Sequence, residues 1–173
     1  LDLTHTLAGP LATMILADLG AEVIKVEPPT GDETRQWAPL VSGISAYYLS
    51  INRGKKSIVV DLKREEGREV VYKLARISHV VFENFRPGVR EELGVDPDTL
   101  FRVNDKLVYV SIKGFKPGSI YEKLPAYDLV IQALSGIMVS TGYEGEPPVR
   151  IPFALFDVYT GMMAALQAVV GLY

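Results

Sequence analysis

The stretch "LDLTHTLAGPLATMILADLGAEVIKVE", Leu1–Glu27, decides the expected fold of this chain. Its first four residues are typical of a short strand, and Ala21–Glu27 is rich in β-branched residues and predicts a second strand. Between them, Gly9–Gly20 has apolar residues at helical spacing and is predicted to end at Gly20. Its apolar face is predicted to consist of Leu11, Met14, Ile15 and Leu19. A strand, a helix and a second strand in succession form a βαβ unit with parallel strands.

The same alternation continues along the chain. Short β-branched runs bounded by turn residues predict further strands at 57–62, 79–85 and 106–115. Helical patterns are predicted at 64–77, at 127–141 and from Phe153–Val158 to the end. A long surface loop is predicted at 28–45, which is rich in proline, glycine and polar residues. This order predicts a single α/β domain, with a mainly parallel, doubly wound sheet and helices on both of its faces.

In sheets of this kind, ligands bind beyond the carboxyl ends of the strands. The segments expected to carry the chemistry are therefore 4–10, 27–35, 61–67 and 83–88. No G-x-G-x-x-G follows the first strand and no P-loop lysine motif is present, which argues against a standard dinucleotide or nucleoside-triphosphate site.

Charge and composition exclude several classes of function. The net charge is −3, so there is no electrostatic case for binding nucleic acid or an anionic membrane surface. The chain has no cysteine, which excludes disulfides, thiolate metal sites and a cysteine nucleophile. Its two histidines, His5 and His79, are too far apart in sequence for a metal motif, and each is expected to be structural. No membrane-spanning segment is predicted, because Asp157 interrupts the apolar closing stretch.

Three segments could bind an anionic or polar ligand, and each also has a simpler explanation. Gly9 and Pro10 offer main-chain N–H groups at a helix start, or only form a turn. The basic residues of 52–58 could hold phosphates, although such runs are usually solvated turns. In 83–88, an amide, an aromatic ring and a guanidinium could meet a polar edge, a base and a phosphate, or only end a strand.

Two carboxylates remain as candidate chemical groups, and for each the simpler role is a helix cap. Asp128 lies at a predicted helix start. Asp157 lies near the start of the last helix but between Phe156 and Val158, whereas capping aspartates usually have polar neighbours. Small residues share its helix face: Gly161, Ala164, Ala168 and Gly171. That bare face leaves room near the carboxylate for a ligand or another backbone, and helix packing alone also explains it.

Six segments in a fixed order resemble the class III CoA-transferases, the formyl-CoA and carnitine-CoA transferase type. They cover nearly the whole chain, at 7–37, 52–63, 80–89, 107–115, 125–142 and 156–166. Known members are much longer, so the resemblance implies that residues 1–173 are the N-terminal part of the large Rossmann-like domain. The small domain, with its glycine-rich active-site loop, is absent from this chain. The resemblance also implies an interlocked homodimer and a cytoplasmic location.

The resemblance further implies an enzyme that moves CoA from an acyl-CoA thioester to a free carboxylic acid. Asp157 stands at the position of the family's catalytic aspartate, which forms covalent aspartyl intermediates. The implied CoA contacts are Thr6, Leu7, Ala8, Val60, Asp61, Leu62, Lys63, Asn84, Phe85 and Arg86. No metal and no permanently bound cofactor are implied, because coenzyme A enters as part of the substrate. The expected partners are acyl-CoA and carboxylic acid substrates, without nucleic acid or membrane.

This sequence departs from the family pattern at several positions. Leu7 replaces the glutamine of formyl-CoA transferases, which argues against formyl or oxalyl specificity. Pro28, Glu92 and Pro125 stand where that subgroup has basic CoA contacts. The 2-methylacyl-CoA racemases of the family need a histidine where this chain has Tyr127, a poor base at neutral pH. Two alternatives stay open: a racemase-like isomerase, and a CoA-binding homologue without turnover.

Overall fold

The computed structural model describes residues 1–173 and has a mixed α/β fold. Two pairs of parallel strands form its centre: β1 (Ile24–Glu27) with β4 (Lys56–Val59), and β5 (Val80–Glu83) with β6 (Val108–Ser111). Asp2 forms parallel bridges with Lys25 and with Phe82, so it lies between the two pairs. The strands therefore lie in the row β4, β1, Asp2, β5, β6, and the four strands predicted after the first are confirmed in position.

The strand predicted at the N-terminus is wrong as a regular strand. Only Asp2 makes bridges, because the carboxylate of Asp2 accepts hydrogen bonds from the main-chain N–H and the hydroxyl of Thr4. These bonds turn the chain away from the sheet immediately after the bridge. The turn leads to Thr6, which has a φ of 70°.

Helices cover both faces of the strands, as the sequence predicts. On one face, α3 (Glu65–Ile77) and α5 (Pro97–Val103) pack against a buried cluster that includes Leu3, Val26 and Val81. Phe82 follows Val81 in β5, and its side chain points to the opposite face because side chains alternate along a strand.

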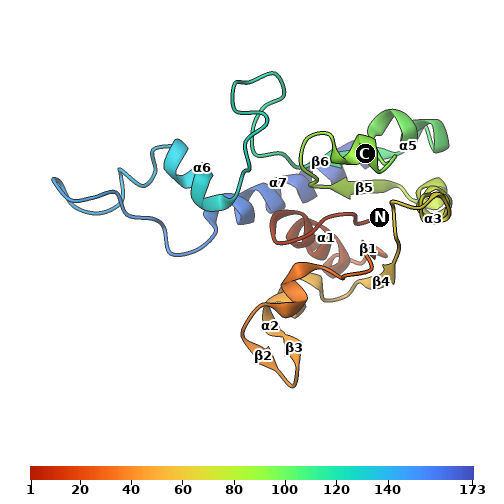
Figure 1. Ribbon diagram of the computed structural model, residues 1–173, viewed down its shortest axis with the longest axis horizontal. Helices are drawn as coiled ribbons and strands as arrows, with labels where there is room; N and C mark the ends of the chain where they lie inside the picture. Colours follow the sequence, from red (N-terminus) through yellow and green to blue (C-terminus); the bar gives the residue numbers. More distant parts are fainter.

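The second face is covered by α1 (Ala8–Asp18) and α7 (Leu155–Leu172), which lie side by side in Figure 1. Phe82 and Val110 pack there against the alanines of α7. The sequence predicted that the last helix starts between Phe153 and Val158, and the start of α7 at Leu155 confirms this.

Close helix packing explains the small residues of α7. A Cβ on Gly161 would lie 2.7 Å from the main-chain oxygen of Ala8, so α1 occupies the space beside this face. The interpretation of the bare face as clearance for a ligand is therefore wrong at Gly161. The predicted apolar face of α1 is also wrong in part, because Leu19 is 76% exposed while Ala12 is fully buried.

The segment 28–45 contains more structure than the predicted loop. It holds a 3₁₀ helix, η1 (Glu33–Gln36), and a hairpin of β2 (Leu40–Val41) and β3 (Ile44–Ser45). Three further helices, α2 (Ala46–Asn52), α4 (Val89–Glu92) and α6 (Asp128–Leu134), complete the fold. The predicted helix 127–141 ends early, near Gly136, whose φ of +79° a continuing helix does not allow. Figure 1 shows the hairpin and the stretch between α6 and α7 projecting from the body.

Buried ion pairs hold the loop that follows Asp2. The Asp2 carboxylate lies 3.0 Å from the Lys55 ammonium, and Lys25 pairs with Asp32 at 3.0 Å, with all four side chains at most 1% exposed. Burial would raise the pKa of Asp2, but the charges of Lys25 and Lys55 and two hydroxyl hydrogen bonds together hold it below its usual range. Lys25 also donates to the main-chain oxygen of Thr4, which fixes the start of the loop.

One helix, α7, is long and apolar enough to cross a membrane by length and composition, with a mean hydropathy of 1.5. The presence of Asp157 therefore does not keep the helix from meeting these two criteria, and the absence of a membrane-spanning segment stays a prediction. Buried helices of globular proteins meet the same criteria. In this chain, Ala164, Ala165 and Ala168 of α7 pack against α1 and the strands.

Candidate functional site

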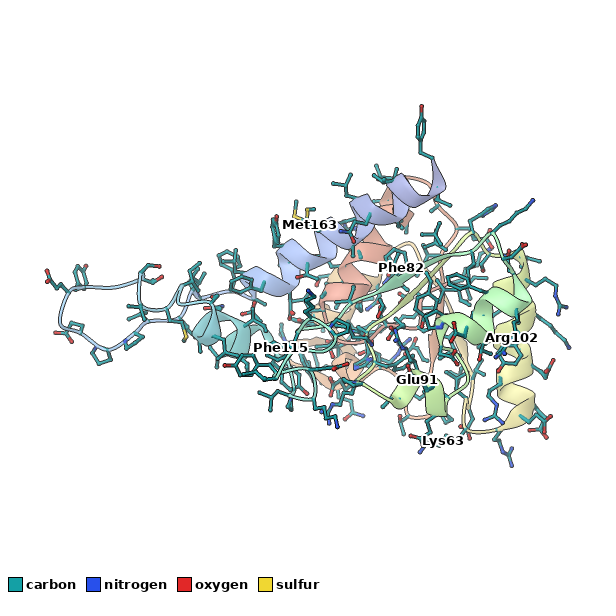
Figure 2. The ribbon with its side chains drawn as sticks, turned by 90° about the horizontal axis from the view of Figure 1, so that it is seen from above. Lys63, Phe82, Glu91, Arg102, Phe115 and Met163 are labelled. Atoms are coloured by element: carbon teal, nitrogen blue, oxygen red, sulfur yellow. The ribbon has the colours of Figure 1, made fainter.

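A cavity of about 380 Å³ opens beyond the carboxyl ends of β5 and β6, where the sheet pattern predicts a ligand site. Five parts of the chain line it: the loop before α1, the segment after β5, the segment after β6, the start of α6, and the first turn of α7. In Figure 2, Phe115 lies near helix α6 and Glu91 on the short helix α4, and both side chains line the cavity.

The cavity brings together most of the residues predicted to form the site. Asp157 lines it with two of the predicted CoA-contacting groups, namely Thr6, Leu7 and Ala8, and Asn84, Phe85 and Arg86. Asp157 and these groups are up to 151 residues apart in sequence, so the fold, rather than local sequence, makes them neighbours.

The remaining predicted group, 60–63, does not line this cavity. Val60 is buried in the core and Leu62 packs against the same cluster. Asp61 accepts a hydrogen bond from the main-chain N–H of Lys63, and the Lys63 side chain is exposed to solvent. A contact of this group with CoA stays a prediction.

Asn84 connects the two loops that carry the predicted CoA contacts. Its side-chain amide donates to the main-chain oxygen of His5 at 2.8 Å and accepts from the main-chain N–H of His5 at 3.0 Å. Both hydrogen-bonding ends of the amide are therefore used within the protein. Asn84 fixes the position of its neighbours, while Arg86 forms no ion pair within the chain and can meet an anion.

The fully buried Glu83 fixes the segment after β5 that contains Asn84, Phe85 and Arg86. Its carboxylate accepts from the main-chain N–H of Phe85 at 2.8 Å and pairs with Lys113 at 2.9 Å and Arg90 at 3.2 Å. Lys113 also donates to the main-chain oxygen of Phe85 at 2.6 Å. Because a buried carboxylate needs such partners, Glu83 keeps two cations of the cavity wall in fixed positions.

Asp157 lies in the first turn of α7 and is not its cap, since Ala154 takes that position. Its carboxylate makes no hydrogen bond and no ion pair with the rest of the chain. Burial raises the pKa of Asp157 to about 6, and the charge of Asp128 adds to this effect. The expected preference of a helix start for the ionised form is thus outweighed, although the group remains mainly ionised at neutral pH.

Asp128 caps α7 instead of its own helix. One of its oxygens accepts from the main-chain N–H of Phe156 at 2.7 Å and of Asp157 at 3.3 Å. The expectation that Asp128 caps the helix it begins is wrong, because Tyr127 occupies the cap position of α6.

Tyr47 was not singled out from the sequence, yet it lies in the electrostatic field of Asp157. Burial raises the pKa of the Tyr47 phenol, and the Asp157 charge raises it further. The Tyr47 ring packs on Trp37, with ring centroids 5.1 Å apart. The sequence predicted a loop up to Ser45, and the helix that contains Tyr47 was not recognised. Ser45 could have indicated this helix, because serine is a common helix cap and Ser45 accepts a hydrogen bond from the main-chain N–H of Tyr48.

Comparisons with known proteins identify the family of this chain. An acetyl-CoA:oxalate CoA-transferase of Acetobacter aceti is 47% identical over 152 residues, which cover 87% of this chain and 39% of that protein. A succinyl-CoA:glutarate CoA-transferase of Homo sapiens is 44% identical over 174 aligned residues, covering 99% of this chain and 40% of that protein.

A crystal structure of a CAIB/BAIF family protein from Brucella suis superposes with a TM-score of 0.93 at 42% identity. The match covers 98% of this chain and 46% of that one, so the chain spans less than half the length of these relatives. The sequence model of CoA-transferase family III matches residues 1–173. This chain therefore belongs to CoA-transferase family III.

Proposed function

We propose that the whole protein transfers CoA from an acyl-CoA thioester to a free carboxylic acid, with Asp157 as the covalent nucleophile. One observation carries this proposal. Asp157 is a shielded carboxylate without a cationic partner, in the cavity that also holds Thr6–Ala8 and Asn84–Arg86. A structural carboxylate is usually paired or hydrogen-bonded, whereas a nucleophile has to keep its oxygen lone pairs free.

The first half of the reaction exchanges the acyl group for CoA on Asp157. A carboxylate oxygen attacks the thioester carbonyl, the C–S bond breaks, and a mixed anhydride and the CoA thiolate result. The thiolate then attacks the carbonyl carbon of Asp157. The donor leaves as a free carboxylate, and an aspartyl-CoA thioester remains.

The second half runs the same steps with the acceptor. The acceptor carboxylate attacks the aspartyl thioester and releases the thiolate, which gives a second mixed anhydride. Attack of the thiolate on the acceptor carbonyl forms the new acyl-CoA and restores the Asp157 carboxylate. In every step an anionic nucleophile, either a carboxylate or a thiolate, replaces an anionic leaving group, so no external acid or oxidant is needed.

The start of α1 offers stabilisation for the oxyanions of these steps. Main-chain N–H groups in the first turn of a helix have no acceptor within the helix, and Ala8 is both in this turn and on the cavity wall. Donors that are already oriented toward a developing negative charge commonly supply a large part of catalysis. Gly161 supports this arrangement, because its lack of a side chain lets α7 approach the main chain of Ala8.

The order of the strands supports a Rossmann-like assignment. Without the β2–β3 hairpin, the row β4, β1, Asp2, β5, β6 places the third, second, first, fourth and fifth segments side by side. This is the order of nucleotide-binding sheets of the Rossmann type. The place of residues 1–173 in a larger domain, the interlocked homodimer and the cytoplasmic location remain predictions from the family resemblance.

A paired screen tests the proposal. The whole protein is incubated with a panel of acyl-CoAs and free acids, and the new acyl-CoA is measured by mass spectrometry, with Asp157→Asn as the control. We expect CoA transfer by the wild type and none by the variant. Transfer that Asp157→Asn retains in full would refute the role of Asp157. Exchange of the proton at C2 of a 2-methylacyl-CoA, without CoA transfer, would favour the racemase.

A further inference from the structure

The one charged group that raises the pKa of Asp157 is a second carboxylate, Asp128. Asp128 lies at the start of α6, and Figure 1 shows this helix beside the first turn of α7. One Asp128 oxygen accepts two main-chain N–H groups of α7, those of Phe156 and of Asp157 itself. The residue therefore touches the main chain of the proposed nucleophile and not the atoms that react.

Gln132 anchors Asp128 one helical turn further on. The Gln132 side chain is 1% exposed and donates to the second Asp128 oxygen at 2.6 Å. The same amide donates to the main-chain oxygen of Phe153 at 3.1 Å and accepts from the main-chain N–H of Ile151 at 2.8 Å. Gln132 is buried and forms a hydrogen bond with each of these groups. Asp128 and the segment 151–153 before α7 are therefore held together as one unit.

We propose that Asp128 is a positioning residue for the Asp157 nucleophile: it fixes the first turn of α7 and places a second negative charge beside the reacting carboxylate. This inference rests on the proposed function. Its two parts come from the same side chain, since the hydrogen bonds set the direction of Asp157 and the charge acts on its reactivity.

The second charge favours covalent catalysis because acylation removes the charge of Asp157. Two nearby carboxylates repel each other, and the repulsion disappears when Asp157 becomes an anhydride or a thioester. Burial raises the pKa of Asp157 and the Asp128 charge raises it further, so the ionised group is a stronger base and a better nucleophile than an ordinary aspartate.

Other ionisable groups surround the site and bear on any pH profile. Those that line the cavity are His5, Arg86, Arg90, Glu91, Lys113, Glu122 and Tyr127. Tyr47 lies within reach of the Asp157 charge from α2. None of these groups raises the pKa of Asp157, which is raised by burial and by the charge of Asp128.

The test is the rate at which the whole protein forms a covalent adduct on Asp157 in a single turnover, followed by mass spectrometry between about pH 5 and pH 8. Asp128→Asn keeps the size of the side chain and removes its charge. We expect the midpoint of the pH profile to fall by about one pH unit. The rate at neutral pH should fall by about 10-fold to 100-fold, because the nucleophile is both less basic and less well held.

Asp96→Asn is the matched control, since Asp96 caps α5 through the N–H and hydroxyl of Thr99 and does not line the cavity. This control should change neither the midpoint nor the rate. Asp128→Glu keeps the negative charge but displaces the carboxylate from the N–H groups of α7. The midpoint of the pH profile should therefore be unchanged, while the rate of adduct formation falls. This variant tests the role of Asp128 if Asp128→Asn does not fold.

The outcomes distinguish failure of the proposed function from failure of the role of Asp128. A wild-type protein that forms no adduct on Asp157 refutes the proposed function itself. If the wild type forms the adduct and Asp128→Asn has an unchanged midpoint and rate, or Asp96→Asn shows the same losses, only the role of Asp128 is refuted. A shifted midpoint in Asp128→Glu would also overturn it.

Discussion

Asp2 and Asp157 are both shielded aspartates, and their surroundings are opposite. Asp2 is fully buried, is paired with Lys55 and accepts hydroxyl hydrogen bonds from Thr4 and Thr13. Its partners outweigh the effect of burial, so its pKa lies below the usual range. Asp157 has no such partners, and its pKa is raised to about 6 by burial and by Asp128.

The difference separates a carboxylate that stabilises the fold from one whose charge no neighbouring cation neutralises. The charge of Asp2 is neutralised by neighbours that also position the loop before α1. The charge of Asp157 is left unneutralised at the wall of the cavity that this loop helps to form. Strongly raised pKa values often occur at functional sites, which is consistent with the role proposed for Asp157.

The largest expected effect is the loss of activity in Asp157→Asn. An amide cannot form the anhydride, so CoA transfer by the whole protein should fall by at least about 10⁴-fold. Steady-state assays with the best donor and acceptor pair measure this. Asp157→Glu serves as the comparison, since it keeps a carboxylate but moves it, and it should retain some adduct formation.

Removal of the charge at Asp2 should affect stability most. In Asp2→Asn, the buried Lys55 loses its carboxylate partner, which should lower the free energy of unfolding by about 3–5 kcal/mol. Urea denaturation measures this change. The contribution of Asp2 is present above its ordinary pKa of 3.8 and is lost as the pH falls through the lower value of the folded chain.

The control for Asp2 is Asp18→Asn. Asp18 pairs with Arg53 at the surface, where its side chain is 42% exposed. Exposed ion pairs contribute little, so this change should cost less than about 1 kcal/mol. Equal losses in the two variants would show that the buried pair is no more important than a surface pair.

Thr13→Val should have an intermediate effect. The Thr13 hydroxyl donates to Asp2 at 2.7 Å and is buried beside it. Loss of a hydrogen bond to a charged group should cost about 1.5–3 kcal/mol, with an unchanged side-chain volume. Denaturation of this variant beside Asp2→Asn measures how much of the stabilisation comes from hydroxyl groups; an unchanged free energy of unfolding would assign it to the lysines alone.

The smallest expected effect is a gain in stability, and it comes from the variant that loses activity. A carboxyl whose pKa is higher in the folded chain holds extra protons there, so its contribution to stability falls as pH rises from 3.8 to about 6. Asp157→Asn removes this penalty. Above that window it should be more stable than wild type by about 1 kcal/mol, after allowance for the solvent that reaches this half-buried group.

The same variant is its own control at low pH. Below the ordinary pKa of 3.8, Asp157 is neutral in both the folded and the unfolded chain, so the two proteins should have the same stability there. A variant that is less stable than wild type at neutral pH would show that Asp157 has a structural partner.

The sequence predicted the alternation of strands and helices because their hydrophobic periods are local properties. It also located Asp157 and the two loops that line the cavity with it. Short elements such as α2 and η1 were missed in the sequence. Their formation depends on tertiary contacts such as the pair of Arg35, in η1, with Glu27. The link from Asp128 to α7 spans 28 residues in sequence, so no local pattern could reveal it.

The assignment of small residues shows the same limit. Spacing on a helix predicted that Gly161 and Ala164 share the face of Asp157, which says that something approaches closely there. Only the structure identifies the neighbour as α1. The pattern of one helix fixes which face is bare, and the partner of that face comes from the rest of the chain.

Chemical trapping of the aspartyl intermediate tests the central claim most directly. The whole protein is mixed with an acyl-CoA, quenched by acid or by hydroxylamine, digested and analysed by peptide mass spectrometry. We predict that the peptide with Asp157 gains the mass of the acyl group or of CoA, that hydroxylamine converts it to a hydroxamate, and that Asp157→Asn shows neither. An adduct on another residue, or rapid CoA transfer with an unmodified Asp157 peptide throughout the first turnover, would contradict the account.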